Sequence, residues 1–229
     1  MQELSISQKQ QLLNQLLPMI SDHKNELFTQ IIQNRMRHLT VVVEDIYQSQ
    51  NASAVLRSAD CFGIQDVHII ENKNEYTINP EVALGSSKWL SLYKYNSEEN
   101  NTKAAFAALR SKGYKIVATT PHKDDTMLED LDINDKVALV FGTELEGLSD
   151  YAIANADVHM KIPMYGFTES YNISVSAALC LHHLSDKIRR SDIDWKLHEQ
   201  EKIEVLLDWA RSVVKSGAEV ERFMFSNSK

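Results

Sequence analysis

The sequence predicts an α/β fold with a mostly parallel sheet and helices on both of its faces. Three observations predict it: β-rich runs alternate with helical runs from residue 39 onward, polar or glycine residues follow three of the predicted strands, and helical segments lie at both ends. The 229 residues, 43% of them hydrophobic, suffice for one domain with extensions. We expect an N-terminal helical extension over 1–38, an α/β domain over 39–188 and a C-terminal helical extension over 189–229.

Hydrophobic periodicity gives the individual elements. Residues 5–37 read as helix, with apolar positions such as Leu12 and Leu16 and an interruption near Pro18. Six β-rich runs predict strands, at 40–43, 67–70, 90–93, 115–118, 137–141 and 158–161. Helices are expected between them at 51–62, 102–111, 150–156 and 172–188, followed by an amphipathic helix near 195–214.

Composition narrows the possible partners. The 32 acidic and 24 basic residues give a net charge of -8, which argues against indiscriminate coating of nucleic acid. Any RNA contact must therefore use local basic clusters, although solvated helix ends are the commoner explanation for either cluster alone. The candidate residues lie before the first strand and after the last core helix: Arg35, Arg37 and His38, and Lys187, Arg189 and Arg190.

The cysteines and the hydropathy pattern predict an intracellular protein without metal or membrane contacts. Cys61 and Cys180 are far apart and belong to no CxxC or Cys/His cluster, so neither a zinc site nor a disulfide framework is expected. No window approaches 18 uninterrupted apolar residues, and no signal-peptide pattern is present. We interpret both cysteines as buried or incidental thiols.

Two common nucleotide sites are excluded by inspection. None of the seven glycines forms the GxGxxG dinucleotide fingerprint. Gly142 and Gly147 have the spacing of a phosphate loop, but Leu148 stands where that loop needs its lysine. A loop without a cation for phosphates suits a ligand that is recognised through backbone groups and apolar walls, such as an adenosine with a sulfonium side arm.

Two glycine-containing loops follow predicted strands. In 141–149 (FGTELEGLS), Gly147 can adopt backbone angles closed to other residues and Ser149 is placed to cap the next helix, so a plain strand-to-helix turn is the alternative. In 162–178 (IPMYGFTESYNISVSAA), Ser170 and Asn172 bracket the start of a helix. These two side chains fit a capping role and a ligand role equally well.

The segment 51–57 (NASAVLR) supplies a strong cation at the same edge. If Asn51 lies at the helix start, the helical period puts Arg57 on one side together with Ser53 and Asp60, opposite a face that packs on the sheet. That packed face consists of Ala52, Val55, Leu56 and Ala59. An i,i+3 pair with Asp60 is the simpler role for Arg57. Glu44 and Asp45, at the end of the first strand, read as solvated carboxylates.

In order and spacing, these three segments resemble the motifs of the SPOUT-class RNA 2′-O-ribose methyltransferases, specifically the TrmH-type (SpoU) tRNA enzymes. The resemblance covers residues 39–188. It implies a trefoil knot at the carboxyl end of the core, S-adenosyl-L-methionine as the cofactor, and a cytoplasmic homodimer whose active site draws on both subunits. It also implies tRNA as the partner.

The resemblance assigns residues by their motif positions. The positions that serve catalysis or hold the cofactor loop are Asn51, Arg57, Glu144, Ser170 and Asn172. The positions expected to contact the cofactor are Thr119, Gly142, Gly147, Ile162, Met164 and Tyr171. Tyr171 departs from the leucine that the family often carries, which leaves a backbone role for that position.

The implied reaction is methyl transfer to the 2′-hydroxyl of the guanosine at position 18 in the D-loop of tRNA. Because a free guanidinium is a poor base, Arg57 is expected to clamp a phosphate and orient the hydroxyl. A ribosomal RNA 2′-O-methyltransferase is the main alternative, but about 38 residues before the first strand are too few for the separate RNA-binding domain that such relatives often carry. A non-catalytic RNA-binding module is a second alternative, and an oxidoreductase is disfavoured by the missing glycine fingerprint.

Overall fold

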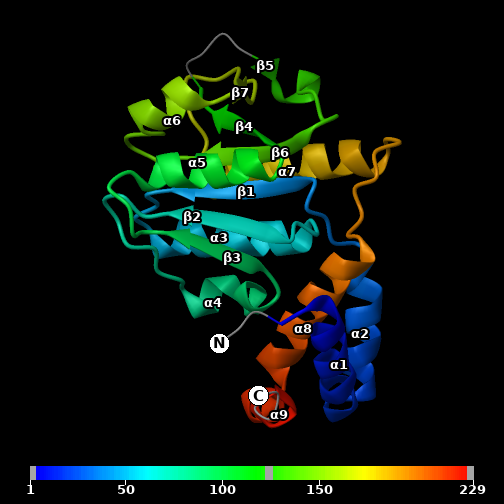
Figure 1. Cartoon of the computed structure of the whole chain (residues 1–229). Helices are drawn as coiled ribbons and strands as arrows, with labels where there is room; N and C mark the ends of the chain where they lie inside the picture. Colours follow the sequence, from blue (N-terminus) through cyan, green and yellow to red (C-terminus); the bar gives the residue numbers. More distant parts are fainter. Residues whose placement is uncertain (1–3, 122–125, 226–229) are drawn as a thin grey trace. The chain divides into compact units, whose positions relative to one another are not determined.

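The computed structural model describes residues 4–121 and 126–225, which form two compact units. One is an α/β unit, Met36–Trp195, and the other is a helical unit made from both ends of the chain (Figure 1). Residues 1–3 and 226–229 of the predicted extensions lie outside the described residues.

The α/β unit is built on a seven-stranded sheet in which every pair of neighbouring strands is parallel. The strand order is β3-β2-β1-β6-β4-β7-β5. The strands are β1 Leu39–Glu44, β2 Asp66–Ile70, β3 Ser91–Tyr95, β4 Tyr114–Thr119, β5 Thr126–Met127, β6 Lys136–Phe141 and β7 Val158–Lys161. The predicted α/β class is confirmed, and β5 was missed because two residues carry no period.

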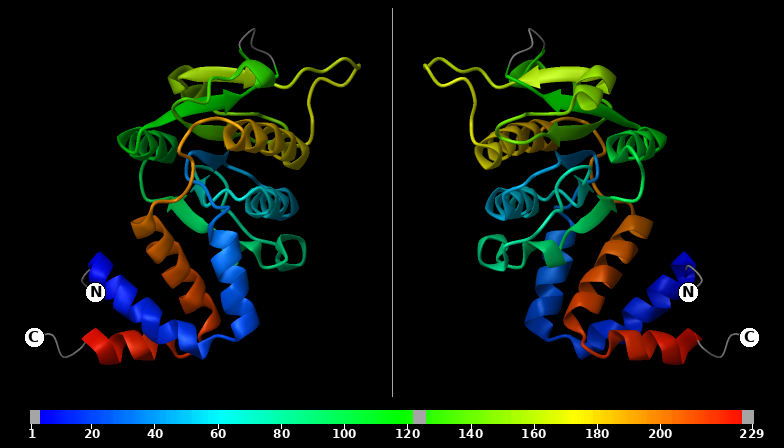
Figure 2. Two further views of the ribbon diagram at one scale, coloured as in Figure 1. Left: turned by 90° about the vertical axis from the view of Figure 1, so that its right-hand side faces the viewer. Right: turned by 90° about the vertical axis from the view of Figure 1, so that its left-hand side faces the viewer.

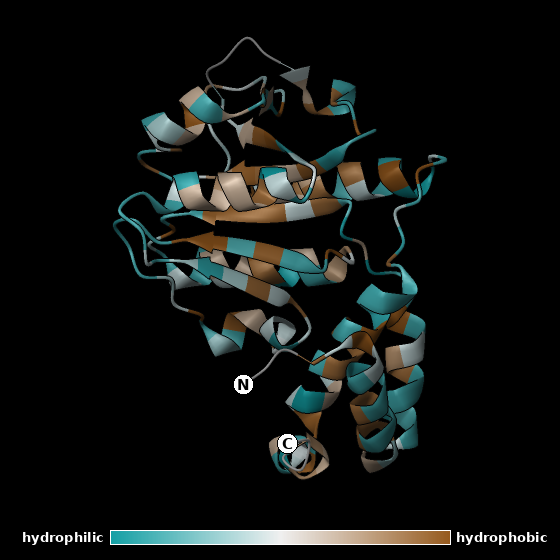
Figure 3. Ribbon diagram, viewed as in Figure 1, coloured by the Kyte–Doolittle hydropathy of each residue, from teal (hydrophilic) through white to brown (hydrophobic). Residues whose placement is uncertain are grey.

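Helices cover both faces of the sheet, as the sequence predicts. Val41 and Val43 of β1 pack with α3 (Ser49–Cys61) and α7 (Ile173–Arg189), whereas Val42 points to the face covered by α5 (Asn101–Ser111) and α6 (Asp150–Asn155). This alternation follows from the two-residue period of a strand, and burial on both faces explains why the central strands are mostly apolar (Figure 3). The short elements are α4 Pro80–Ala83, η2 Ser86–Lys88 and η3 Leu128–Asp130.

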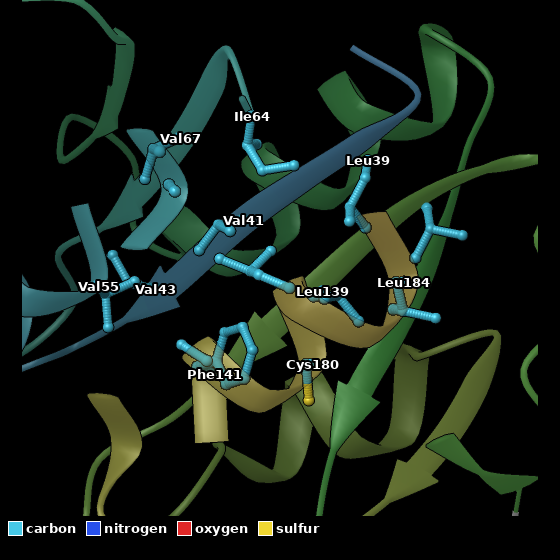
Figure 4. Packing of buried hydrophobic residues seen from close by; sticks show 14 of the residues in the cluster. Leu39, Val41, Val43, Val55, Ile64, Val67, Leu139, Phe141, Cys180 and Leu184 are labelled. Carbon is cyan, nitrogen blue, oxygen red and sulfur yellow. The ribbon is translucent and has the colours of Figure 1, made fainter. Parts of the chain in front are cut away.

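The larger core lies between the sheet and helices α3 and α7. Leu139 and Phe141 of β6 are buried in the same cluster as Cys180 and Leu184 of α7 (Figure 4). Full burial of a leucine or phenylalanine stabilises the fold by about 1.5–3 kcal/mol. Burial raises the pKa of the Cys180 thiol to about 12, so this cysteine is an inert core residue, whereas Cys61 is exposed.

The helical unit contains α1 Ile6–Leu16, η1 Leu17–Met19, α2 Asp22–Ile32, α8 Glu199–Val213 and α9 Gly217–Phe225. The predicted break near Pro18 is confirmed, although the second helix ends at Ile32, before the predicted limit of 37. Its core is formed around Trp209, whose ring lies 5.3 Å from the Phe28 ring and 5.3 Å from the Arg35 guanidinium. No helix in the part of the chain that the structure describes has the length and apolarity to cross a membrane.

Candidate active site

A cavity of 340 Å³ lies at the carboxyl ends of β4, β6 and β7. Parallel strands end at the same edge of a sheet, so loops that are distant in sequence converge there. Eight of the residues that the sequence marked for cofactor binding or catalysis line this cavity: Thr119, Gly142, Glu144, Gly147, Ile162, Met164, Ser170 and Tyr171.

The loop between β6 and α6 is a tight turn closed by its own backbone. The Thr143 amide donates to the Gly147 carbonyl at 2.9 Å, and the Gly147 amide donates to the Thr143 carbonyl at 3.2 Å. Gly147 has a φ of 71°, and a Cβ at Gly142 would lie 2.2 Å from the Gly147 carbonyl carbon and oxygen. Both glycines are therefore required by geometry. Ser149 caps α6 by accepting from the Ala152 amide at 3.1 Å, as the sequence predicts.

Asn172 joins all three sequence motifs. Its side-chain amide donates to Asn51 Oδ1 at 3.2 Å and to a carboxylate oxygen of Glu144. Its Oδ1 accepts from the Ser174 amide at 2.9 Å, which makes Asn172 the N-cap of α7. The cap therefore also fixes the orientation of the amide toward the two other motifs. The loop that leads from β7 into this cap extends away from the sheet (Figure 2).

Glu44 and Asp45 are buried, so the expectation of solvated carboxylates is wrong. Glu44 is 2% exposed and accepts from the Ser149 amide at 2.9 Å and from the Ser149 hydroxyl at 2.8 Å. Asp45 has a φ of 54° and accepts from the backbone amides of Asn72 and Lys73 at 2.7 and 2.8 Å. Buried carboxylates need such partners, and here the partners belong to the loop after β6 and the loop after β2.

Arg57 lies on the exposed side of α3 and does not line the 340 Å³ cavity. Within the described residues, no hydrogen bond or ion pair holds its guanidinium, and no pair with Asp60 forms. Ala52 and Val55 face the sheet as predicted, but Ser53 is fully buried and accepts from the Asn79 amide at 2.7 Å. The prediction for Ser53 was wrong because α3 also packs against α4, which the period of one helix does not reveal.

The basic cluster before the first strand is engaged inside the protein. Arg35 is 2% exposed in the helical unit, Arg37 pairs with Asp66 at 3.1 Å, and His38 Nε2 lies 2.7 Å from the Ile133 carbonyl oxygen. These contacts give all three side chains structural roles. RNA binding by them stays a prediction.

The second basic cluster is partly engaged. Lys187 donates to the carbonyls of Glu129 and Leu131 at 2.8 Å each, and Arg189 stacks 4.5 Å from the centre of the Trp195 ring. Arg190 is exposed and pairs with Asp186 at 2.9 Å. Within this cluster, Arg190 is the most accessible side chain for an RNA phosphate.

The chemistry of the cavity fits a cationic ligand with an apolar body. Leu148, Met160 and Ile173 contribute apolar walls. The missing side chain of Gly142 lets the backbone of Gly147 and Leu148 pass close to it within the turn. The charged side chains that line the cavity are Glu144, Glu146, Glu169 and Lys161. This excess of carboxylates suits a sulfonium and an ammonium group and opposes a triphosphate. Within the described chain, no group of three or more His, Cys, Asp or Glu side chains is placed to hold a metal ion.

Sequence comparison adds the family. The profile of the SpoU rRNA Methylase family matches residues 38–182, which include the three motifs and all the strands of the sheet. The chain belongs to the SpoU family. A relative from Borreliella burgdorferi, named as a tRNA (guanosine(18)-2′-O)-methyltransferase, is 47% identical over 207 residues, which cover 90% of this chain and 93% of the relative.

Solved structures with the SpoU fold agree. The crystal structure of the A. aeolicus TrmH/SpoU tRNA modifying enzyme matches with a TM-score of 0.75 at 25% identity, covering 84% of this chain and 98% of that one. The SpoU methyltransferase AviRb from Streptomyces viridochromogenes, solved with its cofactor AdoMet, matches with a TM-score of 0.60 at 23% identity. That match covers 71% of this chain and 65% of that one, and it supports the fold alone.

Sequence reasoning on this SpoU family member missed the residues that support the site. Glu44 gave no signal beyond its place at a strand end, because its partner Ser149 is 105 positions away. Gln48, whose side-chain oxygen accepts from the Asn51 side-chain amide at 2.9 Å, adjoins the first motif and was not singled out.

Proposed function

We propose that this chain is an S-adenosyl-L-methionine-dependent tRNA 2′-O-ribose methyltransferase that acts on guanosine 18 of the D-loop. The observation that carries the proposal is the Asn172 side chain, which ties Asn51 and Glu144 together beside the 340 Å³ cavity. The activity by which the 47% identical Borreliella burgdorferi relative is named supports the choice of substrate. The target lies in a loop, and specific RNA recognition generally targets loop nucleotides because their bases can leave the stack and enter a protein site.

Three parts of the 340 Å³ cavity would hold the cofactor. They are the turn with Gly142 and Gly147, the loop with Ile162 and Met164, and Thr119 at the end of β4. When bound, the cofactor supplies an electrophilic methyl group for a ribose 2′-hydroxyl. The task of the protein is then to align the hydroxyl and to accept or pass on its proton. Glu144 is the carboxylate that the Asn172 side chain joins to Asn51.

Arg57 clamps an RNA phosphate in this proposal. Its guanidinium is exposed on α3, and bidentate pairing with phosphate is the chemistry for which arginine is best suited. Ser170 lines the same cavity and helps to position the reacting groups.

A homodimer completes the site. Val175 and Leu179 of α7 are 44% and 41% exposed and lie four residues apart, which makes a short apolar stripe on this helix, and Tyr171, 43% exposed, precedes the helix. α7 packs beside α3, which carries Arg57. A second copy that covers this stripe would bring Arg57 of one subunit to the cavity of the other, which accounts for its absence from the cavity of its own subunit.

The chain is organised as one catalytic domain between two helical extensions. Residues 39–188 form the catalytic domain with a trefoil knot at its carboxyl end, and residues 1–38 and 189–229 are helical extensions. Membership of the SpoU family supports the knot. The enzyme acts in the cytoplasm, where its tRNA substrate is found.

The test is a methylation assay with mapped product. The purified protein is incubated with total tRNA, total ribosomal RNA and methyl-labelled S-adenosyl-L-methionine in separate reactions, and the labelled riboses are located by nuclease digestion and mass spectrometry. We expect 2′-O-methylguanosine at tRNA position 18. Label in ribosomal RNA alone would replace the substrate, and binding of the cofactor without transfer to either RNA would favour the non-catalytic module.

A further inference from the structure

A second cavity lies on the other side of the turn that borders the 340 Å³ cavity. Its volume is 280 Å³, and it is lined by the loop after β1, the loop after β2 and the turn 142–146. Both cavities share Glu144 and Ile173 as walls. A wider recess of 610 Å³, which shares Tyr47, Gln48, Lys73 and Asn74 with the second cavity, adjoins it. Together they have the size of a nucleotide site, which needs ~300–1,000 Å³.

The walls of this second cavity are fixed by the two buried carboxylates at the end of β1. The Asp45 carboxylate holds the loop after β2 by accepting from the backbone amides of Asn72, Lys73 and Asn74, the last at 3.3 Å. The Asn74 side-chain amide donates to the Asp45 carbonyl at 3.0 Å. Glu44 holds the opposite loop through Ser149. The positive φ of Asp45 is the kind of backbone strain that functional sites retain.

The lining of the second cavity combines an aromatic ring, a cation and side-chain amides with unused hydrogen-bonding atoms. Tyr47 is 78% exposed, and the Lys73 side chain is 71% exposed. The side-chain amide nitrogen of Gln48 and the side-chain amide oxygen of Asn74 have no hydrogen-bond partner among the described residues. Unpaired RNA bases stack on aromatic rings and offer their edges to amides, and RNA phosphates bind cations. The combination therefore matches a nucleotide better than an apolar ligand.

An ion pair joins the two sides of the cavity. Lys73 Nζ lies 2.9 Å from Glu146 Oε2, and both side chains are more than two-thirds exposed. Exposed pairs of this kind contribute little to stability. An incoming phosphate can therefore take over the ammonium group at small cost.

We propose that the 280 Å³ cavity receives the target nucleotide of the RNA, with its base stacked on Tyr47 and a neighbouring phosphate at Lys73. The assignment rests on the proposed function. It places the ribose at the boundary of the two cavities, where Asn51 and Glu144 meet through Asn172. The methyl donor and its acceptor then occupy opposite sides of one turn.

The test compares paired substitutions on the full chain. Tyr47→Ala removes the ring, while Tyr47→Phe keeps it. Because base stacking contributes about 1–3 kcal/mol, we expect Tyr47→Ala to lower kcat/KM for tRNA by roughly 5- to 150-fold and Tyr47→Phe to stay within about twofold of wild type. The dissociation constant of S-adenosyl-L-methionine, measured by calorimetry, should be unchanged in both variants.

The lysine is tested by salt dependence. Lys73→Ala should weaken tRNA binding and reduce the slope of log K against log salt by about one unit. Lys103→Ala, an exposed lysine on α5, is the matched control and should keep the wild-type slope.

The outcomes separate the two proposals. Failure of the wild type to methylate any tRNA would remove the proposed function and this assignment together. A wild type that methylates tRNA while Tyr47→Ala keeps its kcat/KM would remove the assignment alone. Equal losses in Tyr47→Ala and Tyr47→Phe with weakened cofactor binding would assign Tyr47 a purely structural role.

Discussion

Asn172 shows how one side chain organises the site. Its amide nitrogen donates to Asn51 and Glu144, while its oxygen accepts from the Ser174 amide and hydroxyl. Both ends of the amide are thus engaged, so the side chain has one orientation. The motifs were visible in the sequence, but the role of Asn172 as their connector was not, since capping and ligand contact fitted the position equally well. In the structure it caps the helix and connects the motifs at once.

The role of Arg57 depends on the shape of its guanidinium as well as on its charge. Arg57→Lys keeps the charge but loses the planar fork that grips a phosphate with two hydrogen bonds. We expect kcat to fall at least about 100-fold, as misplacement of a positioned group does, while calorimetry finds cofactor affinity within about threefold of wild type. Turnover near the wild-type value would exclude Arg57 from the mechanism.

His68 gives a prediction about pH. It is 1% exposed, lies 3.0 Å from the Tyr95 hydroxyl and stacks on the Tyr93 ring at 4.8 Å. Burial and then the charge of Lys112 lower the pKa of His68 to about 3. Since the unfolded chain has the ordinary pKa of about 6.5, it binds the extra proton first, and stability falls as the pH drops below about 6.5.

The measurement is urea unfolding at two pH values. Between pH 7.5 and 5.5, this one group should remove about 1.4 kcal/mol of the free energy of unfolding. His68→Phe keeps a flat ring in the stack but cannot titrate, so it should lose less stability over the same interval by that amount. Parallel losses in the two proteins would contradict the buried neutral imidazole.

At the scale of elements, the turn between β6 and α6 separates the two cavities. Its geometry depends on Gly142 and Gly147, and its far end depends on Ser149, which is held by Glu44. The sequence predicted the glycine turn and the serine cap, since both are local features. The Glu44 contact escaped prediction because it joins β1 to the loop after β6, 105 positions further along the chain.

Gly142→Ala tests the turn. The new Cβ would lie 2.2 Å from backbone atoms of Gly147 and 2.4 Å from the Leu148 nitrogen, so the turn must open. We expect cofactor affinity to fall by about tenfold or more, because overpacking against backbone costs about 1–3 kcal/mol. Gly166→Ala is the control, since its nearest neighbour would be at 4.0 Å, and calorimetry should find it unchanged. Equal affinities in the two variants would refute a rigid turn.

At the scale of the whole molecule, the local patterns predicted the fold well and the surface chemistry less well. Periodicity gave six of the seven strands and the helices between them, while α4 and β5 are too short to carry a period. The basic run at Arg35, Arg37 and His38 resembled an RNA patch. Its partners, Trp209, Asp66 and Ile133, come from distant parts of the chain, and no local pattern reveals them.

The proposed homodimer gives a prediction from subunit mixing. Arg57→Ala and Glu144→Ala are each expected to be inactive. If every site takes Arg57 from one subunit and Glu144 from the other, half of all dimers in an equimolar mixture contain one copy of each variant, and each such dimer has one intact site. After exchange, methylation should therefore recover to about a quarter of the wild-type rate. A mixture that exchanges subunits, as shown by native mass spectrometry, yet stays inactive would place the whole site within one subunit.

The strand order of the sheet has a consequence for biosynthesis. Val41 of β1 pairs with Val67 of β2 on one side and with Leu139 of β6 on the other. While the ribosome is still making β6, the nascent chain therefore carries β1, with its apolar residues 41–43, without a partner strand on one side. Such long-range pairing slows folding and leaves the growing polypeptide exposed to aggregation. Chaperone contact during translation should accordingly centre on β1 and cease once β6 has emerged.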